Sequence, residues 1–229
     1  MYNYINVSRL KTTNIYIDFA NVLPWQEKLG WHIDIKRLKL FLDSFNTVQD
    51  VKFYNGTLES DINSQNIIKM ARESNYIVIT KPVKIMKLSI DASSISKSSP
   101  EILKSFVRAP LLKKFDINTI EYLNERLKDL NRQGILYLED RKCNFDVEIG
   151  RDMLRDYDKK CVDNFILWSG DSDFADPVKQ LLDDEKKVVL FATARKVSRE
   201  LNELRSSGLL IFDIQKIRNF ICYAREIKK

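Results

Sequence analysis

Acidic residues are the side chains with which this sequence could do chemistry. Three segments place aspartates beside the ends of predicted strands or helices: IDFAN at 17–21, CNFDVEIGRDML at 143–154 and WSGDSDF at 168–174. A carboxylate buried at the end of an apolar strand costs several kcal/mol unless partners or a cation satisfy it. Carboxylate oxygens are hard ligands that suit Mg²⁺ or Mn²⁺. The candidate catalytic residues and metal ligands are Asp18, Asp146, Asp171 and Asp173.

Each segment also has a purely structural explanation. Asp18 and Asp173 could cap helices or turns, and an acid in a first helical turn, such as Asp146, favours the helix dipole. Asp146 and Asp152 are six residues apart and do not share a helical face, so we do not pair them as ligands. The argument for a metal site is that the carboxylates of all three segments should lie close together. Two strand ends and one helix start place carboxylates on one edge of the sheet, where a divalent cation would relieve their repulsion.

The rest of the composition narrows the chemistry. The single histidine, His32, excludes mechanisms that need two imidazoles and makes a His-rich zinc site unsuitable. No G-x-S-x-G segment is present, and the three cysteines are scattered without a C-x-x-C pair. The formal net charge of +6 has the sign that a polyanionic partner needs. With no apolar window of about 18 residues, we expect a soluble, cytoplasmic protein and no membrane partner.

Short apolar segments alternate with helical patterns along the chain. We expect strands at 14–18, 50–54, 76–80, 135–139, 164–168, 187–192 and 209–213, with 135–139 as a short edge strand. We expect helices at 34–45, 62–73, 145–157, 176–184, 197–206 and 214–227, with Asp34 and Asp176 as N-caps. Such alternation predicts an α/β fold with a mostly parallel sheet covered on both faces. Ligands bind beyond the carboxyl ends of such strands, near a switch in strand order.

A segment of different composition interrupts this alternation. We expect residues 1–229 to form a single domain, with residues 87–133 as a helical, basic insertion within it. Residues 89–99 are rich in serine and predict a flexible stretch, and residues 101–130 predict helix. The insertion could be a basic arm that binds the substrate or a solvated pair of helices. The sequence leaves both open.

Three motifs in order resemble a known family. IDFAN is similar to a strand-one D-x-x-N motif, CNFDVEIGRDML to a K-G-V-D-V-x-L-x-x-D-M-L helix start, and WSGDSDFADPVKQL to an S-G-D-S-D-F segment. Together they resemble the NYN domain, the LabA-like branch of the PIN-like nuclease superfamily. The resemblance implies a three-layer α/β/α PIN-like (Rossmann-like) fold and the activity of a metal-dependent RNase. It also implies an acidic centre formed by Asp18, Asp146, Asp171 and Asp173, with Asn21 in support and Asp152 as a recurring acid of less certain role.

The chain departs from the family pattern at two places. The Lys-Gly that usually precedes Val-Asp is replaced by Lys142, Cys143, Asn144 and Phe145. The insertion at 87–133 is larger than a minimal domain needs. Both departures put the choice of substrate in doubt, although neither removes a carboxylate.

The predicted activity is that of a metal-dependent nuclease, an endoribonuclease-type hydrolase that uses Mg²⁺ or Mn²⁺ to hydrolyse RNA phosphodiester bonds. Ser169 and Ser172 could hydrogen-bond a phosphate, and Trp25, with Trp31 as a weaker candidate, could stack on a base. The candidates for contacting the nucleic-acid backbone are Lys142, Arg151, Arg155, Arg195, Lys196 and Arg199.

Two other functions remain open at the level of sequence. One is a non-catalytic RNA- or protein-binding module on the same fold. The other is a phosphatase, which the absence of a D-x-D motif at the first strand disfavours because the chain reads Asp18-Phe19-Ala20 there. Other nucleic acids as partners, endo or exo cleavage, the number of metals and a homo-oligomer are not decided by the sequence.

Overall fold

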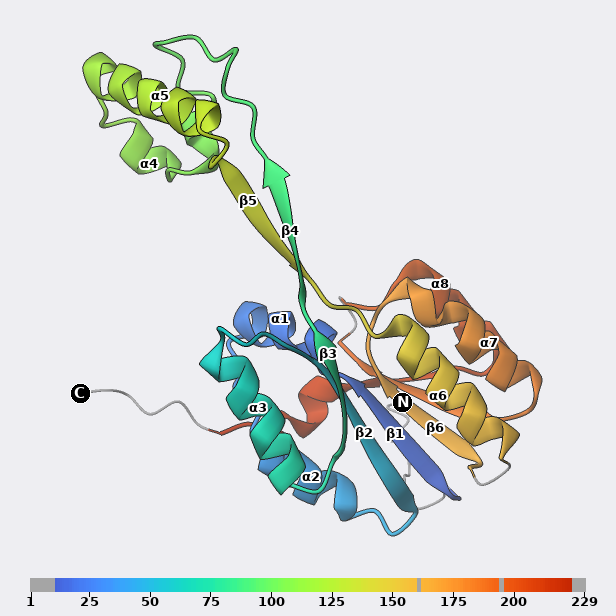
Figure 1. The fold of residues 1–229 in the computed structure, drawn as a ribbon. Helices are drawn as coiled ribbons and strands as arrows, with labels where there is room; N and C mark the ends of the chain where they lie inside the picture. The colour runs from blue at the N-terminus through green and yellow to red at the C-terminus, as the bar shows by residue number, and fades with distance from the viewer. Residues whose placement is uncertain (1–10, 160–161, 194–195, 224–229) are drawn as a thin grey trace. The chain divides into compact units, whose positions relative to one another are not determined.

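The structure, a computed structural model, describes residues 11–159, 162–193 and 196–223 (Figure 1). It divides into two compact units. The first comprises residues 1–83 and 143–229, and the second comprises residues 84–142. Among the described residues, no helix combines the length and the apolar character that crossing a bilayer requires.

A six-stranded sheet forms the centre of the first unit. Its order is β3-β2-β1-β6-β7-β8, and every pairing in it is parallel. The strands are β1 Thr13–Asp18, β2 Val48–Thr57, β3 Ile77–Pro82, β6 Asn164–Trp168, β7 Lys187–Ala192 and β8 Leu210–Asp213. The chain adds strands in one direction from β1 and in the opposite direction from β6. Between these two fully buried strands lies the switch point at which ligands bind in parallel α/β sheets.

Helices cover both faces of this sheet (Figure 1). One group consists of α1 Phe19–Leu29, α2 Ile35–Asp43, α3 Ile62–Glu73 and α9 Arg218–Ile221, and the other of α6 Asp146–Asp158, α7 Ala175–Asp183 and α8 Arg199–Glu203. Short 3-10 helices are η3 Ser172–Phe174, η4 Leu204–Ser207 and η5 Ile214–Ile217. The predicted three-layer α/β/α fold with a parallel central sheet is confirmed. Within the predicted helix 214–227, residues 224–227 lie outside the described residues.

Helix caps follow the sequence only in part. Asp34 caps α2, as predicted, because its side chain accepts hydrogen bonds from the N–H groups of Lys36 and Arg37. The prediction for Asp176 is wrong. Helix α7 begins at Ala175, so Asp176 lies inside the first turn, where its charge favours the helix dipole.

Trp25, a predicted candidate for stacking on a base, lies in helix α1 and faces the core, so that prediction is wrong. Phe19, Val22 and Trp25 recur every three residues on α1, and each is at most 5% exposed because this face of the helix packs on the core. Pro24 lies inside α1 and hid the helical pattern. Trp31 is also 5% exposed, so neither indole is available to a nucleic acid.

The second unit is a hairpin that carries helices. Strand β4 Lys84–Ser89 pairs antiparallel with β5 Tyr137–Lys142. The predicted edge strand 135–139 therefore belongs to this separate ribbon and not to the central sheet. The correction has a simple cause: β4, which has no long apolar run, was not predicted as its partner. The helical part comprises η2 Ile102–Ser105, α4 Ala109–Leu112 and α5 Ile117–Arg132.

One buried amide organises the loop of the second unit. Asn124, on α5, is 0% exposed. Its Nδ2 donates to the carbonyl oxygens of Lys97 and Ser99, each at 2.8 Å, and to that of Ser96 at 3.3 Å. The serine-rich stretch predicted to be flexible is thus tied to a helix by its backbone.

A buried polar network joins α6 to the central strands. Asp156 Oδ2 accepts hydrogen bonds from Tyr16 Oη at 2.6 Å, Asn14 Nδ2 at 2.9 Å and Lys52 Nζ at 2.6 Å. Burial alone would raise the pKa of Asp156, but these donors together outweigh burial and hold the pKa below its ordinary value. The network fixes α6 on β1 and β2, and α6 begins at Asp146.

Replacing Asp156 by alanine should destabilise the fold strongly. Lys52 would keep a charge in a largely buried position, where its side chain is 12% exposed, without its carboxylate. Breaking a buried pair on one side costs about 3–5 kcal/mol, so urea unfolding at pH 7 should show a loss of that order. The control is Asp158→Ala at an exposed position of the same helix, where the change should stay within about 0.5 kcal/mol. Equal midpoints for the two variants would contradict a structural role for the network.

Candidate active site

Asp18 lies at the switch point of the sheet. It ends β1, caps α1 and is 3% exposed. The N–H of Asn21 donates to Oδ1 at 3.3 Å, and the hydroxyl of Ser169 donates to Oδ2 at 3.1 Å. Because Ser169 directly follows β6, these contacts connect the ends of the two central strands.

The turn after β6 carries Asp171 next to this pair. Ser169 Oγ accepts a hydrogen bond from the N–H of Asp171 at 3.4 Å. Asp171 Oδ1 accepts from the N–H of Asp173 at 3.3 Å and from the hydroxyl of Ser172 at 3.5 Å. Asn21 Nδ2 reaches Asp171 Oδ2 at 3.5 Å. Asn21 and Ser169 therefore each contact both Asp18 and the Asp171 turn.

Gly170 makes this turn possible. A Cβ at this position would lie 1.6 Å from the carbonyl oxygen of Lys196, so no other residue fits without moving the backbone. The N–H of Ser198 donates to the carbonyl of Gly170 at 3.0 Å. The segment after β7 is thereby held against the acidic turn.

Asp146 joins the cluster from the start of α6. Its pKa is raised to about 6, first by burial and then by the charges of Asp171 and Asp173 and a hydrogen bond with Asp173, whereas the charge of Lys81 lowers it. The pKa of Asp18 is raised to about 7, chiefly by burial and also by the charges of Asp146 and Asp171, although the hydrogen bonds from Asn21 and Ser169 lower it. The fold thus brings the four predicted aspartates into one electrostatic group.

Sequence reasoning did not select two further groups near Asp146. Lys81, on β3, pairs with Glu148 Oε1 at 2.6 Å and lies over the ring of Phe145 at 4.7 Å. The other carboxylate oxygen of Glu148 is buried with no hydrogen-bond partner among the described residues. Only the parallel pairing of β3 brings Lys81 here, and no local motif signals it.

Asp152 lies apart from the acidic group, as the helical spacing predicts. Its Oδ2 accepts a hydrogen bond from Tyr54 Oη at 2.9 Å, and its Oδ1 pairs with Arg151 Nη2 at 3.1 Å. Its contacts fasten α6 to β2 and do not reach the aspartates above.

The predicted backbone-contacting residues are dispersed. Arg151 and Arg155 lie exposed on α6, Lys196 lies in the segment after β7, and Arg199 begins α8. Lys142 belongs to the second unit and pairs with Asp140 at 3.6 Å. Arg195 lies outside the described residues.

The side chains are not arranged as a finished metal site. No group of three or more His, Cys, Asp or Glu side chains in residues 11–159, 162–193 and 196–223 is placed to hold an ion. The donors near the switch point are nevertheless all oxygens. Asp171 is half-buried and Asp173 is exposed, which leaves both carboxylates room to turn.

Comparisons with known proteins agree with the fold. A crystal structure of a protein of unknown function from Vibrio parahaemolyticus RIMD 2210633 is similar, with a TM-score of 0.54 and 17% sequence identity over 93% of this chain and 97% of that one. At this identity the likeness concerns the fold alone. No curated protein matches the sequence.

The sequence model of the NYN domain matches residues 96–207. The match contains two of the three motifs that carried the resemblance, those with Asp146 and with Asp171 and Asp173. NYN domains are generally nucleases, and their placement in the PIN-like superfamily is consistent with the sheet described above. The recognition made from the motifs is confirmed by this match, in which the NYN domain model covers residues 96–207 of the chain.

Proposed function

We propose that this protein is a metal-dependent ribonuclease whose acidic centre consists of Asp18, Asp146, Asp171 and Asp173. The observation that carries the proposal is electrostatic. Asp18 and Asp146 have pKa values raised by burial and by neighbouring carboxylates, at the switch point of a parallel sheet. Perturbed carboxyls of this kind cluster at functional sites.

The donor set fits a hard divalent cation. It consists of carboxylate oxygens, which Mg²⁺ and Mn²⁺ prefer, and a cation would offset both the burial and the carboxylate repulsion that raise the pKa of Asp18. Since no three-ligand group is assembled in the described part of the chain, binding would require the carboxylate of Asp171 to turn toward Asp18 and Asp146.

Residues around the acidic centre would then have different roles in cleavage. A divalent cation, when bound, supplies an acidified water and neutralises charge on the phosphodiester. Asn21 and Ser169 fix the Asp18 carboxylate, so the centre stays oriented when the cluster loses its protons. Ser172, whose hydroxyl contacts Asp171 only at 3.5 Å, is able to turn toward a substrate phosphate. Lys81 opposes the negative charge at Asp146.

The second candidate function is a nucleic-acid- or protein-binding module without catalysis. The lack of an assembled three-ligand group among the described residues favours it. The two functions differ in one measurement, which is divalent-metal-dependent cleavage of RNA.

Asp171→Asn should abolish that cleavage while leaving the fold intact. The loss of one ligand charge removes several kcal/mol of transition-state stabilisation, equivalent to about a 1,000-fold lower rate. Cleavage of labelled single-stranded RNA with Mg²⁺ or Mn²⁺ measures this, with exposed Asp183→Asn on α7 as the matched control. Equal rates in Asp171→Asn and the wild type would refute the nuclease.

Asp18→Asn should make the metal-free protein more stable at pH 8. The folded chain holds the Asp18 proton up to a pKa of about 7, against 3.8 for the free group, so stability from this group is lost as pH rises through 7. About three pKa units at 1.36 kcal/mol each set an upper limit near 4 kcal/mol for the gain. In urea unfolding with EDTA, the gain should disappear at pH 4. A destabilised Asp18→Asn at pH 8, with Asp183→Asn unchanged, would show that burial of the charge carries no penalty.

Mg²⁺ should raise the thermal midpoint of the wild type at pH 8 and much less at pH 5. Protons on Asp18 and Asp146 compete with the cation below their pKa values of about 7 and 6. At a concentration 100 times the dissociation constant, binding adds about 2.7 kcal/mol to the free energy of unfolding. Differential scanning calorimetry with and without Mg²⁺, at matched ionic strength, measures the thermal midpoint at each pH. If Mg²⁺ raised the thermal midpoint of Asp171→Asn as much as that of the wild type, the ion would bind at a site without Asp171.

A further inference from the structure

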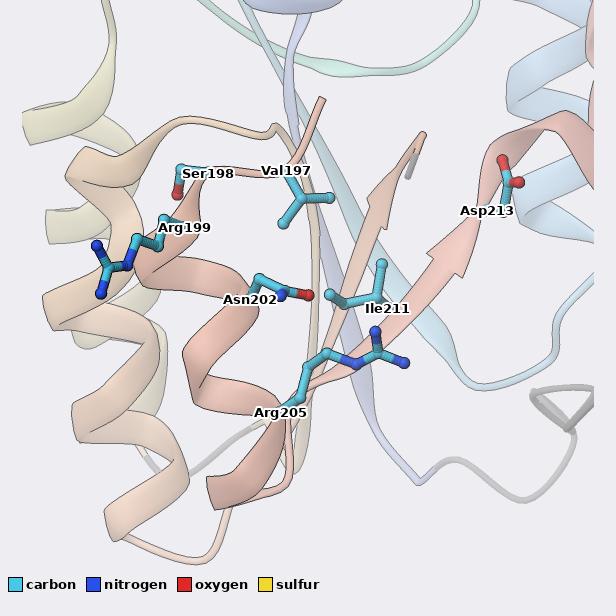
Figure 2. A pocket seen from close by; sticks show the side chains of 7 residues that line it. All are labelled: Val197, Ser198, Arg199, Asn202, Arg205, Ile211 and Asp213. Atoms are coloured by element: carbon cyan, nitrogen blue, oxygen red, sulfur yellow. The ribbon is translucent and has the colours of Figure 1, made fainter. Parts of the chain in front are cut away.

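A cavity of about 490 Å³ opens between the segment after β7, helices α8 and η4, and the edge strand β8 (Figure 2). All of these elements belong to the first unit. The lining side chains that matter here are Val197, Ser198, Asn202, Arg205, Ile211 and Asp213. Its volume falls in the range of about 300–1,000 Å³ that is typical of small-ligand sites.

The cavity adjoins the acidic turn through the backbone. The N–H of Ser198 donates to the carbonyl of Gly170 at 3.0 Å, next to Asp171. Helix α8 also packs against η3, which contains Asp173. A polymer chain that reaches the acidic centre therefore passes close to this hollow.

The charge of the cavity is divided between two sides. Arg205 is exposed, and no carboxylate among the described residues pairs with its guanidinium, which extends beside Ile211 toward β8 (Figure 2). Arg199 instead pairs with Glu203 at 2.8 Å and points away from the hollow. Asp213 Oδ1 accepts from the N–H of Gln215 at 3.0 Å, so its negative charge is held at the far side.

The remaining wall suits the uncharged part of a nucleotide. Val197 and Ile211 offer aliphatic surface on which a base or ribose can lie. The amide of Asn202 points into the hollow and carries both donors and an acceptor (Figure 2). A nucleotide would match these groups: its phosphate would bind the arginine, and its base and sugar would contact the apolar wall and the amide.

We propose that this cavity holds one nucleotide of the single-stranded RNA substrate, beside the phosphodiester at the acidic centre. Arg205 binds the phosphate of that nucleotide, and Asn202 hydrogen-bonds its base. Asp213 keeps the phosphate on the Arg205 side by repulsion. The identity of the ligand rests on the proposed function, whereas the place of binding rests on the cavity.

The test measures binding in EDTA, so cleavage does not enter. A fluorescein-labelled single-stranded RNA is titrated with the full chain, Arg205→Ala, Arg205→Lys and Arg72→Ala at several salt concentrations. Arg72 is an exposed arginine on α3, so Arg72→Ala removes the same charge at a position outside the cavity. Arg205→Ala should bind about tenfold more weakly, and the slope of log affinity against log salt should fall by about 0.7, the value for one phosphate contact on a single strand. Arg205→Lys should keep the slope and recover part of the affinity.

The outcomes separate the two proposals. If Arg205→Ala and Arg72→Ala bind equally well, the cavity proposal is overturned, even where the wild type cleaves RNA. If Arg205→Ala binds selectively worse but no metal supports cleavage by the wild type, the cavity proposal stands and the nuclease fails. Wild-type protein that binds no RNA overturns the cavity proposal directly. Unchanged thermal midpoints in the variants establish that they fold.

Discussion

The burial of a negative charge at the junction of β1 and β6 is the constraint on which the site depends. Asp18 is 3% exposed, yet in the part of the chain that the structure describes it accepts from two donors and lies in the field of two other carboxylates. An ionised carboxylate in such a place is costly unless it is paired. The pKa of about 7 means that the folded chain avoids this penalty by keeping a proton near neutral pH. A cation in place of that proton would neutralise the same buried charge.

The contrast with Asp156 shows that the penalty is not inherent in this fold. Asp156 is also buried against β1, but Lys52, Tyr16 and Asn14 satisfy it at 2.6–2.9 Å, and its pKa is lowered. The same sheet therefore contains one carboxylate that is fully compensated and one that is not. The compensated carboxylate holds α6 in place, and the other lies where ligands bind in parallel sheets. Local imbalance at a site within an otherwise satisfied interior is typical of function.

The sequence predicted what depends on local patterns and missed what depends on pairing across the chain. Apolar segments such as Asn164–Trp168 and the glycine-containing turn after them were sufficient to place Asp171. Strand β4 was missed because all of its side chains are exposed, so no periodicity marks it. Helix α1 was missed because Pro24 suggests a loop, although Pro24 lies at an exposed position inside the helix. Lys81 and Lys52 reach their carboxylates only through the register of β3 and β2, which no sequence window contains.

The distribution of charge is consistent with the division into two units. Residues 84–142 contain twelve Lys and Arg against eight Asp and Glu, so this unit carries four of the six net positive charges although it is the smaller part. The first unit contains Asp18, Asp146, Asp171 and Asp173, and its net positive charge is only two. A polyanion is attracted in proportion to the basic residues that it meets and is repelled by unneutralised carboxylates. A polyanion would therefore be attracted by the basic second unit, but the carboxylates of the first unit would still have to be neutralised. A cation at the carboxylates, together with Arg205, which pairs with no carboxylate of the described residues, would provide this neutralisation.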